Sequence, residues 1–202
     1  IDVAARTLAE SNKVSLVEYD IKMKLATDGM TFPYEGPVTA PATRAAMSDL
    51  GFNDPLIAEQ WNYYNLGDLS IASSAYAGAD INIKDTWKTL TAGDPSVIVA
   101  VVDQGVDYTH PDLVPNMWVN EAEKNGKPGV DDDGNGYVDD VHGYNFVDGE
   151  GDINYDKSQD FDTGHGTHCA GIIGAVNNNG IGMAGVAGGT GNNDGVRIMS
   201  CQ

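Results

Sequence analysis

One segment, residues 162–176 (DTGHGTHCAGIIGAV), constrains the fold more than any other part of the chain. It begins as a glycine-flanked loop and continues with apolar residues at the spacing of one helix face. The residues that share this face are His165, Cys169, Ile172 and Val176. Glycine occurs four times in the segment, which would weaken an isolated helix. We therefore predict a helix over 165–177 that is held by packing, with its small residues close against a neighbouring sheet.

His165 would stand at the start of this helix, between two glycines that let a substrate backbone approach. The positive end of the helix dipole disfavours an imidazolium there, which leaves the ring able to accept a proton. A histidine that only decorates a helix start is an equally good interpretation of this segment taken alone.

A second segment, residues 97–102 (VIVAVV), is a continuous apolar run that ends in Asp103. Such a run is typical of a parallel strand buried on both faces. Its carboxylate would lie at the C-terminal edge of the sheet, where open α/β sheets place their sites. A carboxylate at a strand end is also a common turn or cap residue, so the strand alone leaves its role open.

Residues 103–113 (DQGVDYTHPDL) and 165–168 (HGTH) together resemble two motifs of the subtilisin-like serine proteases in type and order. Their separation, 165 − 103 = 62 positions, also matches. The resemblance covers about residues 53–202. It implies an α/β, subtilisin-like three-layer fold with a mostly parallel sheet, of which this chain holds only the N-terminal half. It also implies that Asp103 and His165 belong to an Asp-His-Ser triad whose serine lies beyond the chain.

The chain is expected to comprise three parts. Residues 1–27 combine a predicted helix with a half-buried strand, and resemble the C-terminal part of an inhibitory propeptide; an unrelated N-terminal decoration is the alternative. Residues 28–52 are rich in proline and glycine, as a linker with a processing site would be. Residues 53–202 form the N-terminal half of the catalytic domain. The chain opens without a starting Met or a signal-peptide pattern, so we expect a piece of a longer product.

Elements predicted within the third part alternate between helix and strand. They are a helix at 81–90, strands at 97–102 and about 141–147, the helix at 165–177 and a strand at 196–201. This order predicts an α/β fold with a largely parallel sheet.

An acidic loop at residues 131–140 (DDDGNGYVDD) follows the calcium-loop spacing of an EF-hand for half its length. His142 stands where the closing glutamate of an EF-hand would be, so an aspartate at 139 or 140 must close the site. A solvated acidic turn is the alternative, but closely packed carboxylates repel one another unless a cation lies among them. The predicted calcium ligands are Asp131, Asp133, Asn135, Tyr137, Asp139 and Asp140.

A second calcium site is implied by the resemblance of residues 176–185 to the calcium loop of thermitase-type subtilisins. The implied ligands are the side chains of Asp54, Asp112 and Asn179 and the carbonyls of Val176, Ile181 and Met183. A plain helix-ending Asn-Gly turn is the alternative. The acidic residues at 148, 150 and 152 are expected to form a solvated loop, with a third, weaker calcium site as the alternative.

Composition limits the partners of the chain. Acidic residues outnumber basic ones by 30 to 11, which argues against nucleic acid and anionic membranes and fits calcium binding or secretion. No run of eighteen apolar residues occurs, so no membrane span is expected.

The two cysteines, Cys169 and Cys201, are expected to be buried thiols, with Cys169 facing away from the cleft. A zinc site of His165, His168 and Cys169 is not expected, because the last two point to different helix sides.

Two hypotheses of different classes follow. The first is a calcium-stabilised serine endopeptidase, secreted or at the cell surface and made as a zymogen. Its partners would be a protein or peptide substrate and the remaining C-terminal half, possibly as a second chain. The second is a catalytically inactive, calcium-binding scaffold or adhesion protein of the same fold. Only the downstream serine separates the two.

Overall fold

The computed structural model describes residues 50–67, 75–154 and 164–202. The chain divides into two compact units, Ile1–Val38 and Thr39–Gln202, and the described residues belong to the second unit. The helix and strand predicted within residues 1–27 and almost all of the predicted linker therefore lie outside the described residues.

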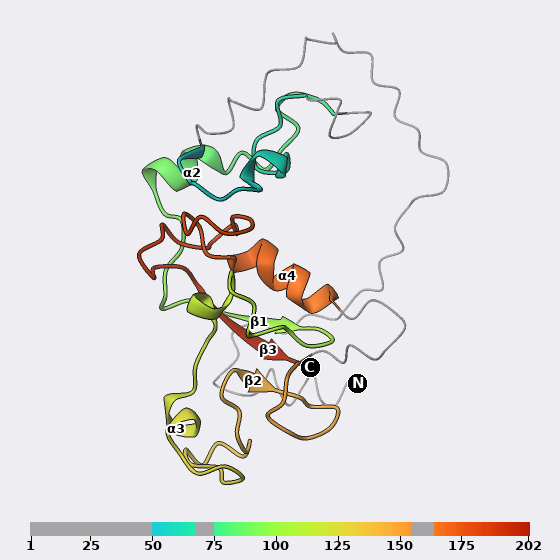
Figure 1. Cartoon of the computed structure of the whole chain (residues 1–202), viewed down its shortest axis with the longest axis vertical. Coiled ribbons are helices and arrows are strands. Elements are labelled where there is room, and N and C mark those ends of the chain that lie inside the picture. Colours follow the sequence, from blue (N-terminus) through green and yellow to red (C-terminus); the bar gives the residue numbers. More distant parts are fainter. Residues whose placement is uncertain (1–49, 68–74, 155–163) are drawn as a thin grey trace, which may run out of the picture. The chain divides into compact units, whose positions relative to one another are not determined.

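The described elements alternate between helix and strand around a small sheet (Figure 1). The sheet has the order β1-β3-β2, and both strand pairs are parallel. This arrangement confirms the predicted α/β class with a mostly parallel sheet. The elements are η2 (Ile57–Glu59), α2 (Lys84–Thr89), β1 (Ile98–Val102), η3 (Val114–Asn116), α3 (Glu121–Lys124), β2 (Gly143–Tyr144), α4 (His165–Gly174) and β3 (Arg197–Cys201).

Some bounds differ from the sequence prediction. Helix α4 ends at Gly174 instead of continuing to residue 177, and the backbone N–H of Val176 donates to the Asp112 carbonyl at 2.9 Å. Strand β2 has only two residues, whereas a strand over about 141–147 was predicted. Helix α3 was not predicted at all. It is four residues long and begins after Asn120, whose side chain caps it, so its signal is local and too short for periodicity to reveal.

Helix α4 packs on the sheet through its smallest residues (Figure 1). Its buried residues are Gly166, Ala170, Gly171 and Gly174. A Cβ atom added to Gly174 would lie 3.1 Å from the Ile198 side chain, so the helix approaches β3 too closely for a larger residue. Ile172, which shares the apolar face noted in the sequence, is 40% exposed. The prediction of close packing by small residues is confirmed, but the face that packs is not the one with the larger side chains.

Strand β1 is buried on one face only, which corrects the expectation of burial on both. Val101 is 5% exposed and joins the core beneath α4, whereas Ile98 is 50% and Val102 is 82% exposed. The alternation follows from the pleat of the strand, because successive side chains point to opposite faces and α4 covers only one of them.

A second apolar cluster lies around Trp87 of α2 and includes Tyr63 and Leu50. The Trp87 indole N–H donates to the Val186 carbonyl at 2.8 Å, and the Tyr63 hydroxyl donates to the Ala184 carbonyl at 3.0 Å. These bonds attach the segment before β1 to the loop that follows α4. The end of the turn at residues 176–185 is therefore fixed to the segment before β1.

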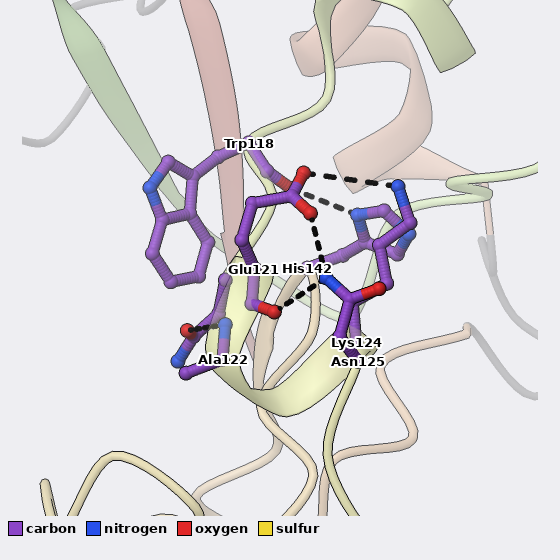
Figure 2. A network of polar contacts seen from close by, with 7 residues as sticks. Trp118, Glu121, Ala122, Lys124, Asn125 and His142 are labelled. Carbon is purple, nitrogen blue, oxygen red and sulfur yellow. Dashed lines mark hydrogen bonds and ion pairs between the residues drawn. The ribbon is translucent and has the colours of Figure 1, made fainter.

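Helix α3 turns its two glutamates in opposite directions. Glu121 faces outward, lies 3.7 Å from the Lys124 ammonium and accepts a hydrogen bond from Asn125 (Figure 2). Glu123 is only 5% exposed and points to the acidic loop. His142 donates through Nδ1 to the Trp118 carbonyl at 2.8 Å, which ties the end of that loop to the segment before α3 (Figure 2).

The close packing of α4 yields a matched pair of substitutions. Gly166→Ala should lower the free energy of unfolding by about 1–3 kcal/mol, because the new Cβ would lie 2.3 Å from the Gly105 carbonyl oxygen. Gly171→Ala should raise it by about 0.5–1 kcal/mol, since its Cβ meets only Met183 at 3.7 Å and alanine favours a helix. Urea unfolding measures both; equal effects of the two substitutions would contradict the packing described.

Candidate active site

Asp103 and His165 meet where β1 ends and α4 begins. Asp103 directly follows β1, and its backbone N–H donates to the Cys201 carbonyl at 3.0 Å, which continues the pairing with β3. The His165 Nδ1 atom lies 2.6 Å from Oδ2 of Asp103. An ionised carboxylate can only accept, so the ring donates its Nδ1–H, and Nε2 is left as the nitrogen that can accept a proton. The His165 side chain is 57% exposed and that of Asp103 is 14% exposed.

Several groups hold the Asp103 carboxylate. Its Oδ1 atom accepts the backbone N–H of Gln104 at 2.8 Å. Partial burial raises the pKa of Asp103, but the hydrogen bonds from Gln104, His165 and Cys169 and the charge of His165 outweigh it, so the pKa ends below its usual value. The carboxylate is therefore ionised and already oriented toward the ring at neutral pH.

The backbone around the pair is equally constrained. Gly166 lies against the turn after β1, where an added Cβ would be 3.1 Å from the Cβ of Asp103. The Thr167 hydroxyl accepts the backbone N–H of Asp107 at 2.9 Å, which fixes the first turn of α4 to the same loop. An open cavity beside the pair is lined by Val102, Asp103, Gln104 and His165. The arrangement offers a general base next to a space that a substrate can enter.

Cys169 lies beside the pair, which corrects the expectation that it faces away from the cleft. Its Sγ atom is 3.7 Å from Nδ1 and 4.0 Å from Nε2 of His165, and its side chain also hydrogen-bonds Asp103. The i, i+4 spacing of the two residues in one helix is the sequence signal for this contact. Cys201 lies in β3, where burial raises the pKa of its thiol, and both cysteines are thiols.

The described part of the chain contains two serines, and neither is placed as a nucleophile. Ser96 precedes β1, at the opposite end of the strand from Asp103. Ser200 is fully buried in β3. The described residues therefore supply no serine nucleophile for this pair.

The acidic loop gathers three carboxylates. One oxygen each from Glu123, Asp133 and Asp140 lies within 4.8 Å of the others, and Glu123 and Asp140 are buried. The side-chain amides of Asn120 and Asn135 bind the oxygens of Asp133 and Asp140 at 2.8–3.1 Å. The sequence did not reveal Glu123, because it stands outside the loop in the unpredicted helix α3.

Burial raises the pKa of Asp140, and the charges of Asp133 and Glu123 raise it further against the hydrogen bonds from the two asparagines. A cation among these carboxylates would reverse both effects. The oxygen-only donor set is the kind that Ca²⁺ prefers, so the residues fit that ion.

The other predicted ligands form hydrogen bonds within the loop or with the residues just before it. The Asp131 carboxylate accepts hydrogen bonds from the backbone N–H groups of Gly134, Asn135 and Gly136. These bonds lower the pKa of Asp131, and the bond from Gly136 has the largest effect. Asp139 accepts the N–H of Gly129. Tyr137 donates its backbone N–H to the Asn135 side chain, and its ring contacts those of Tyr144 and Phe146. Four predicted ligands (Asp131, Tyr137, Asp139 and Asn135) thus shape the loop around the three-carboxylate cluster.

Of the second predicted set of ligands, Asp54, Asp112 and Asn179 lie near one another. Asp54 and Asp112 are each 2% exposed. Asp54 accepts the N–H groups of Asn178 and Asn179 at 2.8 and 3.2 Å. Burial is the largest cause that raises the pKa of Asp54, and the charge of Asp112 adds to it.

Asp112 links this pair to the turn after α4. It accepts the Asn179 amide at 2.7 Å and the Met183 N–H at 3.1 Å. Ile181 donates its N–H to the Asn179 side chain at 2.8 Å. The turn is thus organised around two buried carboxylates.

Among the described residues, the acidic side chains at 148, 150 and 152 form no metal-ligating cluster.

Comparison with known proteins agrees with this geometry. Residues 94–191 match the Subtilase family, Peptidase S8. Subtilisin-like protease 1 of Plasmodium vivax is 50% identical over 113 residues, which are 55% of this chain and 17% of that protein. Neuroendocrine convertase 2 of Bos taurus is 32% identical over 139 residues, which are 69% of this chain and 18% of that protein.

Among solved structures, the serine protease of Aeromonas sobria in complex with a chaperone is similar, with a TM-score of 0.51 and 30% identity. The match covers 74% of this chain and 20% of that one. The chain therefore spans about a fifth of the length of its relatives. In the described part of the chain, every helix is too short or too polar to cross a bilayer.

The lowered pKa of Asp103 predicts how its contribution to stability varies with pH. Asp103→Asn should reduce the free energy of unfolding by about 1–3 kcal/mol near pH 7, because the charged hydrogen bonds are lost. Since the native pKa lies below the ordinary 3.8, the contribution is complete above that value and is lost as the pH falls through the native pKa. Urea unfolding at several pH values should show the difference shrinking below pH 3.8.

Asp85→Asn is the matched control, because Asp85 is an exposed aspartate in the first turn of α2. A destabilisation by Asp103→Asn that is the same at all pH values would contradict the prediction.

Proposed function

The chain belongs to the subtilase family, and on that premise we propose that it is the N-terminal part of the catalytic domain of a serine endopeptidase. The observation that carries this proposal is the 2.6 Å contact between His165 Nδ1 and Asp103 Oδ2 beside an open cavity. The nucleophilic serine and the remaining part of the domain are supplied by residues beyond these 202, in the same polypeptide or as a second chain.

We infer a role for each member of the pair. Asp103 accepts the Nδ1–H of His165 and so holds the tautomer in which Nε2 can take the proton of the serine. As the serine oxygen attacks the peptide carbonyl, the ring becomes an imidazolium, and the adjacent ionised carboxylate stabilises that charge. Nε2 then returns the proton to the leaving amine. The substrate is a protein or peptide, and its chain enters the cavity between Val102 and His165.

An inactive scaffold of the same fold would require none of these contacts. The low pKa of Asp103, its hydrogen bond to the ring and the exposure of His165 all favour the enzyme. The two hypotheses nevertheless share the fold, so an activity measurement must separate them.

We further propose that Ca²⁺ stabilises the protein at two places. At the acidic loop, Glu123, Asp133 and Asp140 would hold the ion, with Asn135 and the Tyr137 carbonyl as further ligands. At the turn after α4, Asp54, Asp112 and Asn179 would hold the second ion, with the carbonyls of Val176, Ile181 and Met183. The support is physical: buried carboxylates repel one another, and a cation offsets that cost.

A secreted or cell-surface location suits a chain with this acid excess, because extracellular calcium would keep such sites filled. Synthesis as a zymogen follows from the likeness of residues 1–27 to an inhibitory propeptide. Both remain proposals drawn from the sequence.

Loss of the histidine tests the catalytic proposal. In the full-length polypeptide, His165→Ala and Asp103→Asn should each reduce kcat/KM for peptide hydrolysis by roughly 10⁴-fold or more, a scale taken from other triad proteases, subtilisin included. Labelling by a fluorophosphonate should fall in parallel, because the serine loses its base. Asp85→Asn should leave both unchanged. Hydrolysis by His165→Ala at a rate close to that of the wild type would refute the proposal.

The two glutamates of α3 test the calcium site in the acidic loop. Glu123→Gln should reduce the rise in Tm that Ca²⁺ produces, since tenfold weaker binding removes about 1.4 kcal/mol of stabilisation. Glu121→Gln should keep the full rise, because Glu121 faces outward with a side chain that is 68% exposed. For each variant, the Tm in a chelator is subtracted from the Tm in Ca²⁺. Hydrogen bonds that the substitution removes in the absence of the ion lower both Tm values, so their effect cancels in the difference. Equal increments would exclude Glu123 as a ligand.

A further inference from the structure

Three different metal-ligating side chains converge at the start of α4. One ligand atom each from Asp103, His165 and Cys169 lies within 4.8 Å of the others. The individual distances are 2.6 Å from Nδ1 to the carboxylate oxygen and 3.7 Å from Nδ1 to the sulfur. The catalytic pair needs only the first two residues, so the thiol adds a chemical capacity that peptide hydrolysis does not use.

We propose that Asp103, His165 and Cys169 form a binding site for Zn²⁺ and similar borderline-soft divalent cations, and that occupation of this site switches off the catalytic pair. Binding requires only these three residues, whereas its effect on catalysis rests on the proposed function.

The donor set selects the class of metal. One thiolate, one imidazole and one carboxylate are typical ligands of Zn²⁺, and a water in the fourth position is usual when three protein ligands bind. Ca²⁺ and Mg²⁺ prefer oxygen ligands alone, so these ions would favour the acidic loop. The site is open to solvent through the cavity that His165 lines, which gives both the ion and the fourth ligand access.

Zinc requires two of the three side chains to move. With Zn–N near 2.0 Å and Zn–S near 2.3 Å, a tetrahedral site places nitrogen and sulfur about 3.5 Å apart. Sγ lies 3.7 Å from Nδ1 but also 4.0 Å from Nε2, so the sulfur is beside the ring and off the direction in which Nδ1 binds a metal. Nitrogen and carboxylate oxygen would be about 3.3 Å apart in the same geometry, so the 2.6 Å hydrogen bond must lengthen by about 0.7 Å. Rotation of the His165 and Asp103 side chains would have to provide both changes.

Binding at Nδ1 removes the general base by a defined change of protonation. The thiol releases its proton to solvent when it becomes a thiolate ligand. The ring gives up its Nδ1 proton and takes one from solvent on Nε2, so it stays neutral and one proton is released in total. With a hydrogen on Nε2, the ring cannot accept the proton of an attacking serine. The ion therefore inhibits by fixing the wrong tautomer of the ring.

The two cysteines provide a matched pair for the test. Co²⁺, as a spectroscopic substitute for Zn²⁺, is titrated into the full-length protein in excess Ca²⁺, which saturates the oxygen-only sites. The Cys201→Ser variant should retain the thiolate-to-cobalt charge-transfer absorption of the wild type, because Cys201 lies in β3 and outside the cluster. Cys169→Ser and Cys169→Ala should both lose it.

Zinc binding by calorimetry gives the second readout. The affinity for Zn²⁺ should fall at least about tenfold in the Cys169 variants. Substitution of a residue that only supports a metal ligand already weakens binding by about that factor. In the active protein, the concentration of Zn²⁺ that halves hydrolysis should rise by the same factor, with each variant's own rate in a chelator as its reference. Unchanged absorption and affinity in both Cys169 variants, or their loss in Cys201→Ser, would overturn the proposal.

The two proposals fail separately. If the protein hydrolyses no peptide, the catalytic proposal fails, but the cobalt absorption still reports the three-residue site. If hydrolysis is normal and Zn²⁺ inhibits the Cys169 variants as strongly as the wild type, the metal site fails and the catalytic proposal stands.

Discussion

The contact between Gly166 and the Gly105 carbonyl is the constraint on which the site depends. A Cβ at position 166 would lie 2.3 Å from that oxygen, so helix α4 can begin directly against the turn after β1 only because the residue is glycine. The same approach sets His165 above Asp103, and the hydrogen bond of 2.6 Å follows from it. Further along the helix, Ala170 and Gly174 keep the axis close to β3. A larger residue at position 166 would move the imidazole away from the carboxylate.

Acidic groups are the second organising feature of the molecule. Asp54, Asp112, Glu123 and Asp140 are all nearly inaccessible to solvent, and burial of a carboxylate costs free energy unless hydrogen bonds or a cation compensate. Backbone N–H groups provide part of the compensation, as those of Asn178 and Asn179 do for Asp54. The raised pKa values of Asp54 and Asp140 show that this compensation is incomplete in the protein alone. Calcium is the natural complement, and it would couple the stability of the fold to the ion.

Cys169 illustrates how one helix turn can serve two chemistries. The spacing of four residues that places it beneath His165 also brings its sulfur within reach of the atom that Asp103 must hold. In hydrolysis, Nδ1 must remain bound to the carboxylate. In metal binding, the same nitrogen would be a ligand, so the two states exclude each other. The competition is local and requires no movement of the fold.

The sequence by itself determined the elements with strong and long signals: the apolar run of β1, the glycine-rich helix α4 and the two motifs that contain Asp103 and His165. It also identified the acidic loop, because closely spaced oxygen ligands are visible in one dimension, whereas the turn at residues 176–185 was implied only by a family resemblance. Tertiary structure alone decided which faces are used. Helix α4 packs through its glycines, and Ile172 is exposed. Strand β1 buries Val101 but leaves Ile98 and Val102 exposed. In both cases the buried face depends on which element lies opposite. Glu123 joined the acidic loop and Cys169 joined the catalytic pair for the same reason: spatial proximity between side chains is a property of packing and not of order along the chain.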